Sequence, residues 1–207
     1  MISLSHLRQF KQQGRKFSCL TCYDASMAKA MEVAEVDSIL IGDSLGMTIQ
    51  GRDSTLPVTV ADMAYHTAAV RRGNQHALIM TDLPFMSYAT LNDALQNSKT
   101  VMQAGAQVVK IEGGAWLSET VQVLTRNGIP VCVHLGLTPQ SVHVLGGYKL
   151  QAKTRAAADQ LIADCQAVVD AGAVLLLLEC VPAQLGKEIA ELFPSVPVIG
   201  IGAGVDT

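Results

Sequence analysis

Seven short apolar runs, separated by stretches with helical periodicity, narrow the folds open to this 207-residue chain. Most of the runs are nearly continuously apolar, which is typical of strands covered by helices on both faces. The units follow one another without a break in composition, so they predict one parallel α/β domain over residues 1–207. The expected strands are residues 16–24, 37–44, 76–82, 106–114, 129–136, 173–180 and 196–204.

The helical stretches between these runs have recognisable ends. Thr59 with Asp62, and Thr90 with Asp93, predict capping boxes that use Asp in place of Glu. In residues 156–172, an apolar face predicts the buried side of a helix. That face consists of Leu161, Ile162, Cys165, Val168 and Val169. Four glycines fall just past apolar-periodic runs, where a left-handed residue ends a helix, namely Gly73, Gly105, Gly128 and Gly172.

Ionisable residues stand at or near the ends of most expected strands, and their distribution separates two architectures. A doubly wound open sheet concentrates its site at one switch point. A closed (β/α)8 (TIM) barrel brings the carboxyl ends of all its strands around one axis. The pattern therefore favours the barrel. The residues concerned are Asp24, Asp43 with Ser44, Asp82, Lys110 with Glu112, His134 and Glu179.

Three of these acids, Asp43, Asp82 and Glu112, are expected to converge in the mouth of such a barrel. Three crowded carboxylates do not all ionise without a counter-charge. Lys110 supplies one positive charge, and a divalent cation would supply more. A set of oxygen ligands suits Mg²⁺ better than Zn²⁺. The sequence therefore predicts a magnesium site, with Ser44 beside it to bond a small anionic ligand.

Each of these residues also has a simpler interpretation. A single aspartate after a strand is more often a helix N-cap or a turn residue, and Asp24 fits that interpretation. Glu179 follows four leucines, so it is expected to be poorly solvated and to have a raised pKa, as suits a proton-transfer group. Its alternative is a buried ion-pair partner. His134 fits a core residue as well as a site residue.

The bulk properties exclude several classes of protein. The net charge is −3 and no basic cluster is present, which argues against a nucleic-acid partner. No segment reaches the ~18 apolar residues of a membrane span. The N-terminus lacks the pattern of a secretory signal, so a cytoplasmic location is expected. The five cysteines are an odd number and do not suggest a disulfide framework.

Two expected loops, residues 45–58 and 136–154, are long for β–α connections. Loops of this length above a barrel mouth are candidate substrate walls or lids. Gly146 and Gly147 give the second loop a candidate hinge.

At these residues the chain resembles a known family. The segments "GDSLGMTIQGRDSTLPVTVADMAYHTAAVRRG", "TDLPFMSYAT", "VKIEGG", "PVCVHLGLTPQSVHVLGGYK", "LLLLECVP" and "PVIGIGAG" occur in this order over essentially the whole chain. Together they resemble the ketopantoate hydroxymethyltransferase family.

The resemblance implies a (β/α)8 barrel of the phosphoenolpyruvate/pyruvate type, with a helix ahead of the first strand. It implies transfer of a hydroxymethyl group from 5,10-methylenetetrahydrofolate to 3-methyl-2-oxobutanoate, which gives 2-dehydropantoate in pantothenate and coenzyme A biosynthesis. It also implies Mg²⁺ as cofactor and assembly as a homodecamer.

Matched position by position, the resemblance also implies a role for each site residue. Asp43, Asp82 and Glu112 would bind the metal. Asp43, Ser44, Asp82, Lys110 and His134 would contact the substrate, and Glu179 would be the catalytic base.

The chain departs from the family in two places. Relatives continue past the glycine-rich segment, whereas this chain ends at "GAGVDT". The expectation is therefore a barrel without its C-terminal strand and helices. The second departure is Ala152, where relatives usually carry glycine.

Three other functions remain open from the residues. One is a Mg²⁺-dependent 2-oxo-acid lyase or mutase of the same barrel superfamily, although neither long loop contains the cysteine that such enzymes place there. Another is an inactive, truncated barrel. The third is a nucleotide-binding open sheet, for which no phosphate-loop fingerprint is present.

Overall fold

A computed structural model describes all residues from 1 to 207, and it contains the seven expected strands. Each strand is shorter than its apolar run; the first, for example, shrinks to Cys19–Thr21. The chain divides into two compact units, Met1–Ile111 and Glu112–Thr207. The boundary falls inside strand β4 (Val108–Glu112), whose last residue begins the second unit.

The first unit contains four parallel strands in the order β1-β2-β3-β4. Their register places Ile39 beside Ile79 and Met80 beside Val108, and these side chains are fully buried. The strands are β1 (Cys19–Thr21), β2 (Ser38–Ile41), β3 (Leu78–Asp82) and β4 (Val108–Glu112). The helices are α1 (Leu4–Gln12), α2 (Ala25–Val33), α3 (Leu45–Thr48), α4 (Val60–Gly73) and α5 (Leu91–Gln103).

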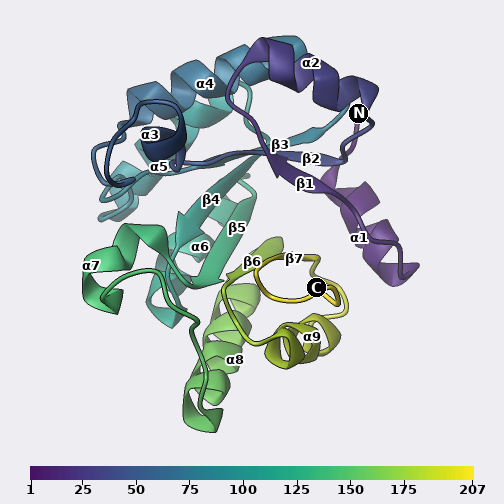
Figure 1. The fold of residues 1–207 in the computed structure, drawn as a ribbon, viewed down its shortest axis with the longest axis vertical. Helices are drawn as coiled ribbons and strands as arrows, with labels where there is room; N and C mark the ends of the chain where they lie inside the picture. The colour runs from purple at the N-terminus through teal and green to yellow at the C-terminus, as the bar shows by residue number, and fades with distance from the viewer. The chain divides into compact units, whose positions relative to one another are not determined.

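Helices α2 and α4 lie side by side in the first unit, and α4 packs on β2 and β3 (Figure 1). Gly73 makes this contact possible, since a Cβ there would lie 2.2 Å from the Ala25 carbonyl oxygen. The prediction that Gly73 is a left-handed residue beyond the helix was wrong. It is the last residue of α4, and close packing requires the glycine there.

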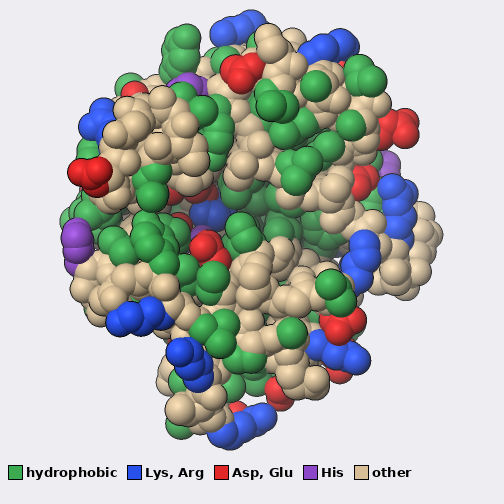
Figure 2. Space-filling view, viewed as in Figure 1, with side chains coloured by type: hydrophobic (Ala, Val, Ile, Leu, Met, Phe, Trp, Pro, Cys, Tyr) green, Lys and Arg blue, Asp and Glu red, His purple; other side chains and the backbone are tan.

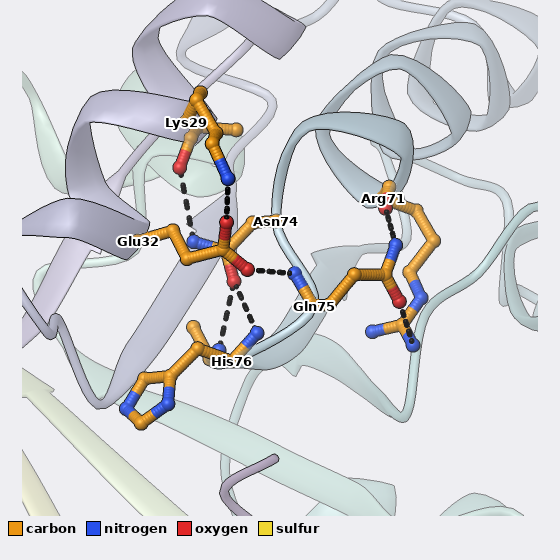
Figure 3. Close-up of polar contacts among 8 residues, drawn as sticks. Lys29, Glu32, Arg71, Asn74, Gln75 and His76 are labelled. Carbon is orange, nitrogen blue, oxygen red and sulfur yellow. Dashed lines mark hydrogen bonds and ion pairs between the residues drawn. The ribbon is translucent and has the colours of Figure 1, made fainter.

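The turn between α4 and β3 is fixed by side chains that reach back to α2 (Figure 3). Asn74 is fully buried, and its amide donates to the Ala28 carbonyl. The side-chain oxygen of Asn74, Oδ1, accepts from the backbone N–H groups of His76 and Ala77. Glu32 of α2 accepts from the backbone N–H of Gln75 at 2.8 Å. These bonds satisfy the backbone groups of the turn, as buried polar groups require.

The second unit contains three parallel strands in the order β5-β6-β7. Helix α8 packs on β5 and α6, and it buries Leu161, Cys165 and Val168 as predicted, while Ile162 and Val169 are only half-buried. The strands are β5 (Val131–Gly136), β6 (Leu175–Glu179) and β7 (Val198–Ile201). The helices are η1 (Ala115–Leu117), α6 (Ser118–Arg126), η2 (Pro139–Ser141), α7 (Val142–Leu145), α8 (Arg155–Asp170) and α9 (Ala183–Leu192).

Short helix η1 carries Trp116, the chain's one tryptophan. Its indole lies against the backbone of Gly113, where a Cβ would come within 2.5 Å of the ring. The rest of the indole remains open, and 70% of the residue is exposed. Glycine at position 113 therefore lets the ring come close to the end of β4.

Most of the predicted helix ends are confirmed. Thr59 and Asp62 form the reciprocal bonds of a capping box at the start of α4. Thr90 caps α5 through the Asp93 N–H. Asp24 caps α2 by accepting from two backbone N–H groups, as its simpler interpretation required. Three of the four glycines follow their helices with positive φ, namely Gly105, Gly128 and Gly172.

The two long loops contain short helices of their own. Helix α3 lies within residues 45–58, and η2 and α7 lie within residues 136–154. Helix α7 ends at Gly146, which is left-handed with φ of 67°. Ala152 also has a positive φ of 53°, which is unusual for a residue with a Cβ.

The charged side chains, the helices and the cysteines can be described separately. On the face shown in Figure 2, lysine and arginine side chains are scattered among acidic ones and form no continuous basic patch. None of the helices has both the length and the apolarity that crossing a membrane requires. All five cysteines are free thiols. Burial raises the pKa of Cys165 to about 12, so its thiol stays protonated near neutral pH.

Candidate active site

In the first unit, two buried carboxylates and one buried ammonium group meet at the ends of β2, β3 and β4. Asp43, Asp82 and Lys110 are 3%, 2% and 3% exposed. The strand register pairs Asp82 directly with Lys110, and the Lys110 Nζ lies 2.5 Å from Asp82 Oδ1. The backbone N–H of Asp43 donates to Asp82 Oδ2 at 3.0 Å.

The two aspartates also lie close to each other, with carboxylate oxygens within 4.8 Å. The two carboxylates are crowded together in a buried place, and crowding of this kind raises the cost of ionising both. A buried negative charge is costly unless a cation balances it. The arrangement therefore suits a further positive charge at Asp43 and Asp82.

Ser44 follows Asp43 and faces Tyr23, which lies between β1 and α2. The Ser44 Oγ is 2.7 Å from the Tyr23 hydroxyl oxygen. Gly42 leaves a small space beside them, since a Cβ there would lie 3.0 Å from Ser44 Oγ and 3.6 Å from Asp82 Oδ2. Tyr23 was not predicted to be a site residue, although it lies near the end of the first expected strand, residues 16–24.

In the second unit, His134 of β5 stands between two glutamates. Its Nδ1 lies 3.2 Å from Glu112 Oε1, and its Nε2 lies 3.3 Å from Glu179 Oε2. The backbone N–H of Gln140 donates to Glu112 Oε2 at 3.0 Å. Both His134 contacts are ion-pair contacts rather than hydrogen bonds, and they attract most strongly when the ring is protonated. His134 is therefore a polar bridge rather than an isolated core residue.

Glu179 is less buried than the four preceding leucines suggested, because 19% of its side chain is exposed. Strand β6 ends at Glu179, and the backbone turns at Cys180, which has a positive φ of 48°. Two backbone hydrogen bonds hold this turn. The Cys180 N–H donates to the Ile201 carbonyl, and the Cys180 carbonyl accepts from the Gln151 N–H. Left-handed backbone at a non-glycine residue is costly and is often found at active sites.

Strand β4 itself relates Lys110 to Glu112. The two residues are separated by one position, so their side chains project from the same face of the strand. Both are buried, at 3% and 4% exposure. The strand thus presents a cation and an acid side by side, at about 6.6 Å along its axis.

The whole chain, residues 1–207, matches the family described as ketopantoate hydroxymethyltransferase. The chain belongs to this family. It is therefore an enzyme of the hydroxymethyltransferase type, as the resemblance predicted.

Similar proteins of the family come from species of Acinetobacter and Psychrobacter. A protein of Acinetobacter baumannii (strain AYE) is 89% identical over 99% of this chain and 76% of its own length. A protein of Acinetobacter baylyi is 86% identical over the whole chain and 77% of its own length. A protein of a Psychrobacter species (strain PRwf-1) is 66% identical over the whole chain and 76% of its own length. All three are called 3-methyl-2-oxobutanoate hydroxymethyltransferase.

Solved structures give the fold class. A 2,3-dimethylmalate lyase of the PEP mutase/isocitrate lyase superfamily matches with a TM-score of 0.68 at 16% identity, over 97% of this chain and 72% of its own. A phosphonopyruvate hydrolase in complex with oxalate and Mg²⁺ matches with a TM-score of 0.68 at 13% identity, over 98% and 81%. The predicted (β/α) barrel fold is thereby confirmed. The roles of individual site residues stay predictions.

Proposed function

We propose that this chain transfers a hydroxymethyl group from 5,10-methylenetetrahydrofolate to 3-methyl-2-oxobutanoate, giving 2-dehydropantoate for pantothenate and coenzyme A synthesis. The observation that carries the proposal is the 89% identity, over 99% of the chain, to a protein named for that 2-oxo acid and that transfer. The buried acids and Lys110 add chemical support, since a small anion and a cation would both find partners among them.

In this proposal, Asp43, Asp82 and Glu112 hold a Mg²⁺ ion. All three are buried and offer carboxylate oxygens, the ligands that Mg²⁺ prefers. The closeness of these carboxylates supports the assignment, because a cation beside them would offset their mutual repulsion. When bound, Mg²⁺ supplies Lewis acidity that stabilises developing negative charge on the oxygens of a 2-oxo acid.

Lys110 and Ser44 would hold the substrate in place. An ammonium group has three N–H donors, so Lys110 can keep its contact with Asp82 and still bond a substrate oxygen. The Ser44 hydroxyl would be a second, neutral donor, to the carboxylate of the substrate. Fixing the substrate in this way lowers the entropic part of the barrier.

Glu179 would act as the base. The C3–H bond of 3-methyl-2-oxobutanoate breaks, the proton passes to the Glu179 carboxylate, and the electron pair forms the enolate. Carbon C3 then bonds to the methylene carbon of the folate as one of its two C–N bonds breaks, and the freed nitrogen takes the proton from Glu179. Water replaces the second nitrogen on that carbon, so the hydroxyl stays on the product, the hydrogen of water goes to the nitrogen, and tetrahydrofolate leaves. His134 would orient this base, since its Nε2 lies 3.3 Å from Glu179 Oε2.

Two further properties are proposed from the resemblance to the family. The chain would assemble as a homodecamer and work in the cytoplasm. The free cysteines are consistent with a reducing compartment. Native mass spectrometry of the purified protein tests the assembly.

The variant Glu179→Gln tests the proposed base. We expect it to keep binding of 3-methyl-2-oxobutanoate while product formation falls by about 10²- to 10⁴-fold, because the amide cannot accept the proton. Two measurements are needed: formation of 2-dehydropantoate with Mg²⁺ or with chelator, and exchange of the C3 proton in D₂O without folate. Both rates should fall together.

The matched control is Glu191→Gln, which removes an exposed carboxylate of α9 and should leave both rates unchanged. Near-normal turnover by Glu179→Gln would contradict the role of this residue. No product from the unaltered chain with Mg²⁺ and both substrates would contradict the proposed function itself.

A further inference from the structure

Tyr23 joins the end of β1 to the residue that follows Asp43. Its hydroxyl oxygen lies 2.7 Å from Ser44 Oγ, a bond between side chains 21 residues apart in sequence. The bond is partly buried, so water competes with it only in part. Ser44 is a proposed substrate contact, whereas Tyr23 has no role in the mechanism described above.

The position of the Tyr23 hydroxyl places it among the site residues of the first unit. The space that a Cβ on Gly42 would fill lies 3.0 Å from Ser44 Oγ, 3.6 Å from Asp82 Oδ2 and 3.7 Å from the Tyr23 hydroxyl oxygen. The phenol oxygen therefore borders the same small space as the Asp82 carboxylate. Its bond to Ser44 is part of the site.

The direction of the bond follows from acidity. A phenolic O–H is a stronger hydrogen-bond donor than an aliphatic O–H, because phenol is the stronger acid. Tyr23 is therefore the expected donor and Ser44 Oγ the expected acceptor. A hydroxyl that accepts in this way directs its own hydrogen elsewhere and becomes a better donor, since chained hydrogen bonds polarise one another. Ser44 is then set to donate to an anionic oxygen.

Tyr23 is held in place from two sides. Its carbonyl oxygen lies 2.7 Å from Nδ1 of His66, a residue of α4, and the two rings meet edge to face at 6.3 Å. The next residue, Asp24, caps α2 through two backbone N–H groups. His66 itself is half-buried.

We propose that Tyr23 is a positioning residue, which turns the Ser44 hydroxyl so that its hydrogen points at the carboxylate of the 2-oxo-acid substrate. The inference rests on the proposed function, because it assigns Ser44 to that carboxylate. His66 fixes the backbone from which the phenol projects. Tyr23 thus acts on substrate binding through Ser44.

The test is a double-mutant cycle with Tyr23→Phe, Ser44→Ala and both together. Phenylalanine keeps the ring and its contact with His66 and removes only the hydroxyl. We expect Tyr23→Phe to raise KM for 3-methyl-2-oxobutanoate about 3- to 10-fold, as loss of one hydrogen bond implies, while kcat stays within about twofold. In the Ser44→Ala background the same change should alter KM less than about twofold.

The control is Tyr65→Phe, which removes an exposed hydroxyl from the other ring beside His66 and should change neither constant. An unchanged KM for Tyr23→Phe overturns the inference. An equal rise in KM with and without Ser44 also overturns it, because Tyr23 would then contact the substrate directly. A fall in kcat alone would place Tyr23 in the chemical step and overturn it as well.

The proposed function is checked first and separately, by Mg²⁺-dependent C3 exchange in the unaltered chain. Absence of exchange and of product there is a failure of the proposed function. If exchange in the unaltered chain is normal and Tyr23→Phe leaves KM unchanged, only this inference fails.

Discussion

Two residues near the proposed base adopt a backbone conformation that disfavours their side chains. Cys180 directly follows Glu179, and Ala152 follows Gln151, whose N–H donates to the Cys180 carbonyl. Each left-handed non-glycine residue costs about 1 kcal/mol or more. The surrounding hydrogen bonds must offset this cost. The backbone at Ala152 and at Cys180, next to Glu179, is therefore under local strain.

We expect Ala152→Gly to relieve part of that strain. Glycine adopts a φ of 53° without a Cβ clash, so the substitution should stabilise the folded chain by about 0.5 to 1 kcal/mol. Urea unfolding and amide hydrogen exchange across residues 146–153 measure the effect. Exchange in this segment should slow.

Gly146→Ala is the matched control with the opposite sign. Gly146 has a φ of 67° at the end of α7, so a Cβ there should destabilise the same segment. If Ala152→Gly destabilised the chain as much as Gly146→Ala, backbone strain at Ala152 would not be the cause of its unusual conformation.

That the acids and Lys110 at the strand ends lie close together could be predicted from sequence, but their orientation could not. Asp43, Asp82 and Lys110 stand at strand ends, and a parallel sheet brings those ends together, so strand periodicity sufficed. The Tyr23–Ser44 bond escaped prediction because a tyrosine hydroxyl leaves no periodic signal. The partial exposure of Glu179 depends on the turn at Cys180, which an apolar run does not encode.

At the scale of elements, helix α4 shows how one acid stabilises a helix start. Asp62 accepts from both the N–H and the hydroxyl of Thr59, and the Asp62 N–H donates back to that hydroxyl. Two hydrogen bonds from Thr59 hold the pKa of Asp62 below its usual value. The bond from the Thr59 side chain has the larger effect, and the bond from its backbone N–H the smaller. The bonded form is therefore the carboxylate.

Because this pKa is lowered on folding, the carboxylate contributes stability above its unfolded pKa of about 3.9 and loses it as pH falls through the folded pKa. We expect Asp62→Asn to cost about 0.5 to 1 kcal/mol at pH 7 and progressively less below about pH 4. Urea midpoints across this pH range measure the change. Asp53→Asn, which removes an exposed loop carboxylate, is the control, and an Asp62→Asn penalty independent of pH would refute the argument.

The elements themselves were largely predictable. All seven strands and most caps follow from apolar periodicity and from the residue types at helix ends. Gly73 was misassigned because its role depends on Ala25, a contact 48 positions away that local pattern cannot express. The short helices in the two long loops were missed, since α3 and α7 span only four residues each, too few to establish a period.

At the scale of the whole molecule, the proposed metal ligands are far apart in sequence, at positions 43, 82 and 112. A ligand that binds only the folded state stabilises it by mass action. We therefore expect Mg²⁺ at 100 times its dissociation constant to stabilise the chain by about 2.7 kcal/mol.

Thermal unfolding with Mg²⁺, with chelator and with Mg²⁺ restored measures this stabilisation. Glu112→Gln and Asp43→Asn should each abolish most of the upward shift in Tm, while the exposed Glu191→Gln should keep it. Loss of the shift only in Asp43→Asn would remove Glu112 from the proposed ligand set. One unfolding transition is expected if residues 1–207 form one domain, as the sequence predicted.

Family and fold class were both accessible from sequence, because the motifs that carry the chemistry are the ones that end the strands. Sequence did not give the polar bridge Glu112–His134–Glu179, whose members lie on three different strands. Spacing along the chain does not set the distance between side chains on neighbouring strands. Only the strand register and the side-chain conformations do so.

Trp116 gives the molecule an optical reporter of its own. The chain has one tryptophan, so all of its indole fluorescence comes from a single ring, 70% exposed and four residues from Glu112. Indole emission moves to shorter wavelength when water leaves the ring. A partner or second copy that covered η1 would therefore change the light from this ring, and no added dye is needed to see it.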